Sequence, residues 1–423
     1  MIFFDYLVEH NRYLNLVGIV GVLACAFFLS SHKKKINVRL TVSALLMHLV
    51  LAWCILKTMV GTWLLMQLSQ VIEKLYQAAD SGICFLFGNL AHADGSWGHI
   101  FAVKVLPVII FFAALTSLLF HFGIIQWVSS MMARLVRPLL GTSGAETLCA
   151  VANSFLGQTE APLLIKNYLA KMTRSEMFLV MVSGMGTLSA ALLAVYAAKG
   201  VPVQHLLCAS VIAVPATIFI AKMLEPETEE PETASAAKVV MEVPSRNMLD
   251  AIAIGTSDGL QLVLNIGAML IAFIALIGAL NTLLAWGCGW GNEFLVWLGS
   301  NWQLPILSLQ YIFGYLFLPV GWLLGFTGSE MMQVSELIGT KFSINEMVAY
   351  MHMLEMPLSP RAIILSTYAL CGFANFSSIG IQLGGIGVLA PSKRHLLSSL
   401  GFKALLGGTL ANLFSAFVVG LLI

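Results

Sequence analysis

Long apolar runs constrain this chain more than any other feature of its sequence. Each run is about 20 residues or longer, which is the length a helix needs to cross a bilayer. In hydrocarbon every backbone N–H and C=O must be paired internally, so only helices or a closed barrel can span. The runs are continuous and do not alternate every second residue, which favours helices. The candidate spans are residues 11–31, 38–60, 98–123, 175–198, 203–222, 250–286, 360–390 and 400–422.

Composition supports this class, because only 10% of the 423 residues are charged, against about 25% in soluble domains. No basic stripe with interleaved aromatic residues suggests binding to nucleic acid, and the seven cysteines lack metal-ligand spacing. We therefore predict an all-α polytopic membrane protein with eight transmembrane helices, two re-entrant hairpins in an inverted repeat, and an interfacial helix.

Positive charge predicts the orientation of the spans, since lysine and arginine concentrate in cytoplasmic loops. Most of these residues fall in four loops that one topology places on the same side. Both termini then lie outside the cytoplasm. The N-terminal residues lack a basic region and a cleavage site, so we expect the first span to direct insertion. We expect a multi-pass protein of a bacterial cytoplasmic (inner) membrane.

Three kinds of segment depart from an ordinary span. Residues 62–80 alternate apolar and polar side chains at helical period, which is typical of a helix in the membrane interface. Residues 223–247 are acidic and proline-containing and predict a polar linker. Residues 143–172 and 327–356 are apolar with polar centres, and each begins and ends on the same side of the membrane, so we predict two re-entrant hairpins.

The predicted segments are 1–97 (first spans and interfacial helix), 98–142 (scaffold span and arm), 143–222 (first hairpin and following spans), 223–248 (cytoplasmic linker), 249–326 (scaffold span and arm) and 327–423 (second hairpin, broken span and last span).

The two predicted hairpins resemble each other and lie on opposite sides of the membrane. Glu160 and Glu346 are 186 residues apart, and Thr187 and Asn375, in the spans that follow, are 188 apart. Each of these spans carries a small and polar interruption at its middle. Inverted repeats with broken helices are the architecture of secondary transporters, with the substrate site at the midplane.

The two glutamates need an explanation, because a charge at the bilayer centre costs about 2.5–3.5 kcal/mol even on lenient scales. Either neighbouring groups satisfy each one, or both face a substrate cavity. Carboxylates favour a neutral or cationic solute that donates hydrogen bonds. Gln158 could pair with an amide-like edge, Asn375 and Ser378 with hydroxyls, and Phe373 with a flat ring. Ribonucleosides combine these features.

Three motifs resemble the concentrative nucleoside transporters, over the chain from about residue 98 to its end. They are Gly157-Gln158-Thr159-Glu160-Ala161-Pro162, Asn345-Glu346-Met347-Val348-Ala349-Tyr350, and Cys371-Gly372-Phe373-Ala374-Asn375-Phe376-Ser377-Ser378-Ile379-Gly380. Met347 stands where phenylalanine is usual, a departure that should alter packing and not chemistry.

The resemblance implies a homotrimer in which a scaffold domain holds a mobile transport domain that moves like an elevator. The transport domain contains both hairpins and both broken spans. In the family's pattern the first hairpin and its span bind the base, and the second hairpin and its span bind the ribose. The matching base positions here are Gln158, Thr159, Glu160 and Leu192, with Phe373 close by. The matching ribose positions are Glu346, Asn375 and Ser378.

The resemblance also implies a coupling ion, which is sodium or a proton. Similar proteins hold sodium between the first hairpin and the following span. The matching positions are Asn153 and Thr187 through side-chain oxygens, and Leu156 and Leu188 through carbonyls. Alternatively, the Asn and Thr only cap helix breaks, and a proton on one of the two glutamates drives transport.

The sequence thus predicts a sodium-coupled symporter for nucleosides such as uridine or adenosine. An enzyme is disfavoured because the nine histidines show no His-Glu-x-x-His or comparable spacing. A channel does not need two opposed hairpins that close one site. Inverted-repeat carriers for anions are the nearest structural rival, and the paired glutamates argue against them.

Overall fold

The structure, a computed structural model, describes residues 2–91, 100–233, 245–299 and 302–423. These residues form helices and connecting turns, with no β-strand among them, which confirms the predicted all-α class. The boundary predicted between residues 97 and 98 lies outside the described residues, and so does the central part of the linker predicted at 223–248.

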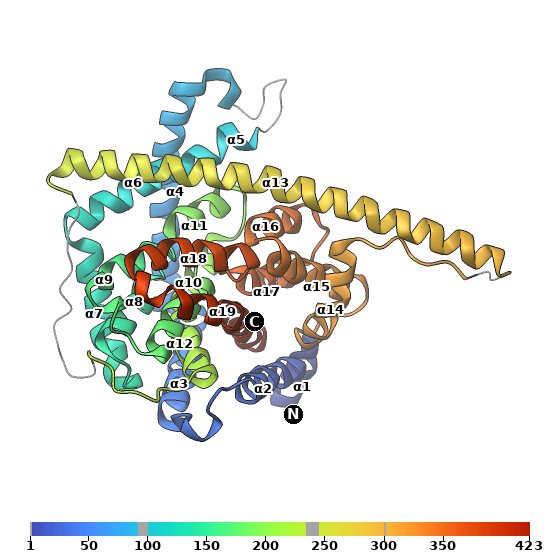
Figure 1. The fold of residues 1–423 in the computed structure, drawn as a ribbon, viewed down its shortest axis with the longest axis horizontal. Helices are drawn as coiled ribbons and strands as arrows, with labels where there is room; N and C mark the ends of the chain where they lie inside the picture. Colours follow the sequence, from blue (N-terminus) through green and yellow to red (C-terminus); the bar gives the residue numbers. More distant parts are fainter. Residues whose placement is uncertain (1, 92–99, 234–244, 300–301) are drawn as a thin grey trace.

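The helices are introduced here in chain order (Figure 1). The first group is α1 (Ile2–Val8), η1 (Glu9–Asn11), α2 (Arg12–Phe28), η2 (Lys33–Lys35), α3 (Val38–Lys57), α4 (Met59–Phe87), η3 (Gly88–Ala91), α5 (Phe101–Lys104), α6 (Leu106–His121) and α7 (Ile124–Leu140). The second is α8 (Gly144–Ala152), η4 (Ala161–Ile165), α9 (Lys166–Leu169), α10 (Arg174–Gly186), α11 (Ala190–Ala198) and α12 (Val203–Leu224). The third is α13 (Met248–Trp297), α14 (Leu309–Leu323), α15 (Gly328–Ser343), α16 (Glu346–Glu355), α17 (Pro360–Leu370), α18 (Phe376–Leu389), η5 (Pro391–Lys393) and α19 (Arg394–Leu422).

Seven helices in the described residues are long and apolar enough to cross a membrane, with the α10–α11 pair taken as one. An eighth is possible if α14 and α15, which meet at a bend of 117°, form one span. The span predicted at 360–390 is divided into α17 and α18, and α13 extends well beyond the predicted 250–286. The two predicted hairpins correspond to α8–α9 and α15–α16. The total of eight spans, and the interfacial position of α4, stay predictions.

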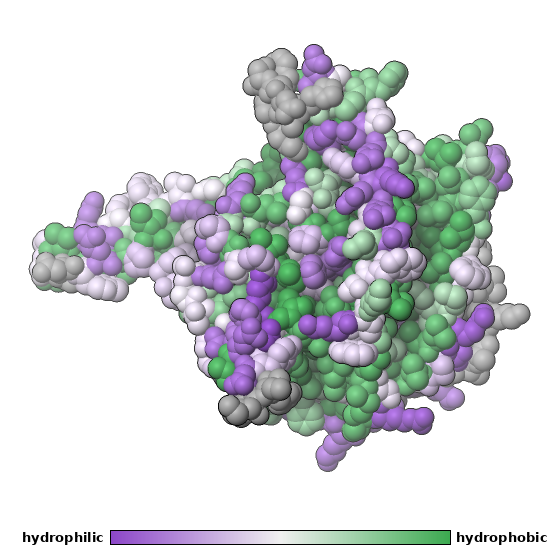
Figure 2. Space-filling model, turned by 180° about the vertical axis from the view of Figure 1, so that it is seen from behind, coloured by the Kyte–Doolittle hydropathy of each residue, from purple (hydrophilic) through white to green (hydrophobic). Residues whose placement is uncertain are grey.

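Burial divides the helices into a packed interior and an exposed exterior. In the apolar window of α10–α11, 94% of residues are buried inside the protein, against 6% in that of α13. In Figure 1, α13 runs along one edge of the molecule and projects beyond it. Apolar residues cover much of the surface seen in Figure 2. Lipid or another protein chain must cover such a surface, because a soluble monomer rarely exposes large apolar patches.

An ionic network joins the end of α12 to the first hairpin. Buried Lys222 lies 2.7 Å from the Glu146 carboxylate, and Glu146 belongs to the capping box that begins α8. Glu225, just beyond α12, receives Lys403 at 2.8 Å and Arg174 at 2.6 Å. Burial raises the pKa of Glu225, but the hydrogen bonds from these two cations and from Ser31 outweigh it, so that its pKa lies below the usual value. The charged carboxylate therefore holds α10, α12 and α19 together at one end.

Close packing of α6 against α13 depends on glycine. A Cβ at Gly255 would lie 2.7 Å from the Ala113 carbonyl oxygen, and one at Gly259 would lie 2.8 Å from the Ile110 Cα. Ser117 Oγ donates to the Ala251 carbonyl oxygen at 2.8 Å across the same contact. Small residues allow helix backbones to approach each other in membranes.

We expect Gly255→Ala to lower the stability of the purified protein by about 1–3 kcal/mol, because the added methyl group would overlap the Cβ of Ser117 and the backbone of α6. Gly278→Ala on the same helix is the matched control, since nothing lies within 4 Å of a Cβ there. Heat inactivation in detergent measures both variants. Equal midpoints for the two variants would contradict the close contact.

Candidate functional site

The first hairpin places its polar residues in a turn without regular helix. Ser143 begins α8 through its capping box, and the helix ends at Ala152. Residues 153–160 then turn the chain back before η4 begins at Ala161, with Pro162 in its first turn. The turn therefore carries Asn153, Gln158, Thr159 and Glu160, all of which the sequence analysis singled out.

The first broken span lies against this turn. Helix α10 ends at Gly186, and α11 begins at Ala190 with Ser189 as its N-cap. The Ala190 N–H donates to the Phe155 carbonyl oxygen at 3.0 Å, which ties the break to the hairpin tip. Leu188 lies in the break and is fully buried.

Asn153 has a buried oxygen that no hydrogen bond from the described residues satisfies. Its side chain is fully buried, and its Nδ2 donates to Ser183 Oγ at 2.9 Å. Its Oδ1 has no hydrogen-bond partner, although a buried acceptor left unpaired costs about 1–3 kcal/mol. Leu156 and Thr187, two further predicted ligands, are also buried. Leu156 lies in the same turn as Asn153, and Thr187 follows α10 and donates its hydroxyl to the Ser183 carbonyl oxygen at 2.8 Å. A buried amide oxygen without a partner, in a set that also offers hydroxyl and carbonyl oxygens, fits a hard cation such as sodium.

The second hairpin and second broken span repeat this construction. Asn345 caps α16 by accepting the Val348 N–H at 2.9 Å, which places Glu346 at the helix start. Helix α17 ends at Leu370, and α18 begins at Phe376. Asn375 caps α18 by accepting the Ser378 N–H at 2.9 Å.

Side chains from both halves meet in one buried polar cluster. Glu346 accepts a hydrogen bond from Asn375 Nδ2 at 3.0 Å. Gln158 Nε2, from the first hairpin, donates to Ser378 Oγ at 3.2 Å. All four side chains are at most 6% exposed. The structure therefore joins four of the predicted substrate residues, although more than 200 positions separate Gln158 from Ser378 in sequence.

The sequence analysis missed two members of this cluster. Tyr196 OH donates to the second oxygen of Glu346 at 3.1 Å, and Gln382 Nε2 donates to Gln158 Oε1 at 3.1 Å. Gln382 follows Ser378 by four residues and so lies on the same face of α18. That spacing could have identified Gln382 from the sequence. Tyr196 follows Leu192 by four residues in α11, and only the fold shows that it reaches the other hairpin.

Three further predicted residues are buried or packed against α18. Phe373 and Leu192 are 9% and 5% exposed, and Thr159 contacts the backbone of α18 at Gly385. A Cβ at Gly184 would lie 2.9 Å from Gln158 Cβ, so α10 closes the cluster from a further side.

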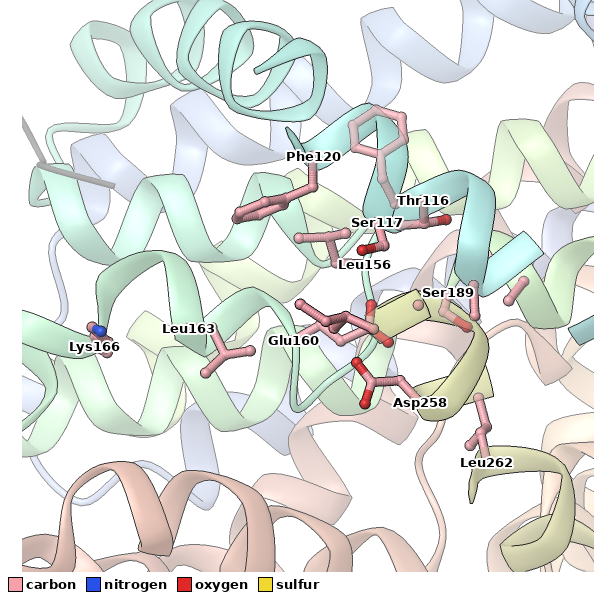
Figure 3. A pocket seen from close by; sticks show the side chains of 15 residues that line it. Thr116, Ser117, Phe120, Leu156, Glu160, Leu163, Lys166, Ser189, Asp258 and Leu262 are labelled. Carbon is pink, nitrogen blue, oxygen red and sulfur yellow. The ribbon is translucent and has the colours of Figure 1, made fainter. Parts of the chain in front are cut away.

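Glu160 lies apart from Glu346, at a different surface of the first hairpin. One of its oxygens accepts the Gly157 N–H at 3.1 Å. Its carboxylate lines a cavity of about 220 Å³ between the hairpin and helices α6 and α13, together with Ser117, Ser189 and Asp258 (Figure 3). The structure therefore does not bring the two glutamates into contact, and a guest shared by both stays a prediction.

Three family profiles cover most of the chain. Residues 205–420 match the C-terminus of the Na+ dependent nucleoside transporters, and residues 17–90 match the N-terminus. Residues 102–202 match a profile described as nucleoside recognition, named Gate.

Curated relatives extend over nearly the whole chain. An uncharacterized transporter of Haemophilus influenzae is 41% identical and is covered over 97% of both chains. The nucleoside permease NupC of Helicobacter pylori is 38% identical, again over 97% of both. The sodium/nucleoside cotransporter 1 of Rattus norvegicus is 36% identical over 97% of this chain and 64% of its own length.

Solved structures also match the fold of this chain over nearly its whole length. CNTnw in an inward-facing substrate-bound state has a TM-score of 0.88 and 36% identity over 97% of both chains. A variant of CNTnw in an outward-facing state also has a TM-score of 0.88, with 35% identity over 97% of both. The prediction of a transporter, and not an enzyme, is thereby confirmed. The chain belongs to the Na+ dependent nucleoside transporter family, that of the concentrative nucleoside transporters.

Proposed function

We propose that this protein is a secondary active symporter that imports nucleosides, such as uridine or adenosine, with a sodium gradient as the driving force. The observation that supports this most is the buried cluster of Glu346, Asn375, Ser378 and Gln158. It combines a carboxylate, two amides and a hydroxyl from both halves of the chain. These groups accept and donate hydrogen bonds, as a ribose and a heterocyclic edge require.

In this proposal each half of the cluster binds one end of the solute. The Glu346 carboxylate and Asn375 amide accept from and donate to the ribose hydroxyls. Gln158 pairs with the edge of the base, with Thr159 beside it, and Glu160 would meet the solute from the cavity that it lines. Leu192 and Phe373 pack against the ring. The bound nucleoside replaces the protein's own hydrogen bonds, such as that from Gln158 to Ser378, so binding exchanges partners and leaves few groups unpaired.

Sodium would be held by Asn153 and Thr187 through side-chain oxygens and by Leu156 and Leu188 through carbonyl oxygens. The bound ion would supply positive charge that orders the hairpin turn against the break between α10 and α11. The unpaired Oδ1 of Asn153 supports this assignment. A proton-coupled carrier is the alternative, because Glu160 faces a cavity where it could exchange a proton.

The proposed movement divides the chain into a scaffold containing α6 and α13 and a transport domain containing both hairpins and both broken spans. The exposed apolar surface of α13 suits contact with two further copies in a homotrimer, since only 6% of its apolar window is buried within one chain. An elevator movement of the transport domain along the scaffold would then carry the site across the inner membrane. Both termini would lie outside the cytoplasm.

We expect an inward sodium gradient to drive concentrative uridine uptake into proteoliposomes at constant pH. Sodium and pH are varied independently, with the membrane potential clamped. If uptake depends on the proton gradient and not on sodium, the coupling ion is a proton and the proposed sodium coupling is wrong. Absence of uptake for every nucleoside tested would contradict the proposed substrate.

We expect Glu346→Gln to reduce kcat/KM for uridine uptake at least about tenfold, because a hydrogen bond to a charged group contributes about 1.5–3 kcal/mol. The matched control is Glu355→Gln, on the same helix but exposed. Uridine uptake by the two variants is compared under equal sodium gradients. If Glu346→Gln transports as well as the control, Glu346 does not bind the ribose.

We expect Asn153→Ala to raise the sodium concentration for half-maximal uptake about tenfold or more, because the cation loses a buried amide oxygen. Ser154→Ala is the control. Ser154 follows Asn153 directly, and its buried hydroxyl donates to the Val151 carbonyl oxygen at 2.6 Å. A sodium dependence that stays unchanged in Asn153→Ala would remove this residue from the ion site.

A further inference from the structure

One side chain of α19 connects the two helix breaks. Asn412 is 2% exposed. Its Nδ2 donates to the Gly186 carbonyl oxygen at 2.8 Å and to the Cys371 carbonyl oxygen at 2.7 Å. Gly186 is the last residue of α10, and Cys371 directly follows α17. Carbonyls at a helix end lack a partner within the helix, so a single amide satisfies one orphan carbonyl at each break.

A buried lysine fixes the orientation of this amide. Lys341 of the second hairpin is 2% exposed, and its Nζ donates to Asn412 Oδ1 at 2.6 Å and to the Ala369 carbonyl oxygen at 2.9 Å. An ammonium group can only donate, so the amide oxygen must face Lys341 and the amide N–H groups must face the two carbonyls. Among the described residues no carboxylate lies within ion-pair distance of Lys341 Nζ, so its direct contacts are these two oxygens, and Glu346 interacts with it electrostatically at longer range.

The two breaks also touch each other at this point. A Cβ at Gly372 would lie 2.8 Å from the Met185 carbonyl oxygen and 2.5 Å from Asn412 Oδ1. The backbones of the two breaks therefore pack directly against each other at Gly372, beside the Asn412 amide. Packed interiors move between discrete arrangements and do not deform smoothly.

The residues that follow each break are those of the proposed ion and nucleoside sites. Thr187 and Leu188 come directly after Gly186, and Phe373 and Asn375 come two and four residues after Cys371. We propose that Asn412, oriented by Lys341, is a positioning residue that couples sodium binding at the first break to nucleoside binding at the second. This inference rests on the proposed function, which supplies the two ligands.

A merely structural role would lower the amount of folded protein and leave the coupling intact. Coupling is measured as the KM for uridine at low sodium divided by the KM at saturating sodium. For a coupled pair of sites this ratio is at least about 5. Asn412→Asp keeps the size of the side chain and an oxygen for Lys341, but it removes both N–H donors.

We expect the ratio to fall to about 1–2 in Asn412→Asp, because the KM at saturating sodium rises toward the KM at low sodium. Lys341→Met keeps the amide but frees its orientation, and we expect an intermediate ratio. The control is Ser415→Ala, which removes a buried hydrogen bond at 3.0 Å within the same helix and should keep the wild-type ratio. All four proteins are reconstituted and assayed together.

A wild-type ratio in Asn412→Asp would overturn the inference, as would equal losses in Ser415→Ala. If Asn412→Asp does not fold, Lys341→Met decides by the same criterion. A wild-type protein whose uridine uptake ignores sodium would instead remove the proposed function and, with it, the two sites to be coupled. The wild-type arm therefore separates the two failures.

Discussion

Unpaired peptide groups are not tolerated in a bilayer, and the core of this protein is organised around that constraint. Four segments lose regular helix inside it, at two hairpin turns and two breaks. Each break leaves carbonyl and N–H groups without a partner in its own helix. The structure pairs them across elements: Ala190 with Phe155, and Gly186 and Cys371 with the amide of Asn412. The interruptions are stable because they face one another.

The same arrangement concentrates polar side chains in one buried place. Helix starts at Glu346 and Phe376, and the cap at Asn375, direct N–H groups and an amide toward one buried cluster. Helix N-termini attract negative charge, and so the Glu346 carboxylate is stabilised at the start of α16. The unpaired Oδ1 of Asn153 is a separate buried acceptor in the first half.

Much of the fold could be predicted from the sequence, since the apolar runs indicate the helices and the polar interruptions indicate where two of the spans break. The breaks at Thr187 and Cys371–Asn375, and the two hairpins, fall where polar residues interrupt apolar runs. Gln158, Glu346, Asn375 and Ser378 could be predicted because the motifs that carry them are polar at apolar depth. The structure brings these four side chains into one cluster, and their role in binding a nucleoside stays a prediction.

Other features could not be predicted, because they depend on distant parts of the chain. Tyr196 and Asn412 are polar residues in largely apolar helices, and nothing local shows that they reach the other half. The 50-residue length of α13 was hidden because an apolar run does not reveal whether a helix ends at the membrane surface. The separation of Glu160 from Glu346 followed from a turn whose direction the repeat pattern does not encode.

The most direct test of the central claim is a structure of the purified protein determined with uridine in sodium chloride. The claim predicts the ribose against Glu346 and Asn375, the base against Gln158, and a cation at the oxygen of Asn153. Uridine bound outside the cluster that joins the two hairpins would contradict it.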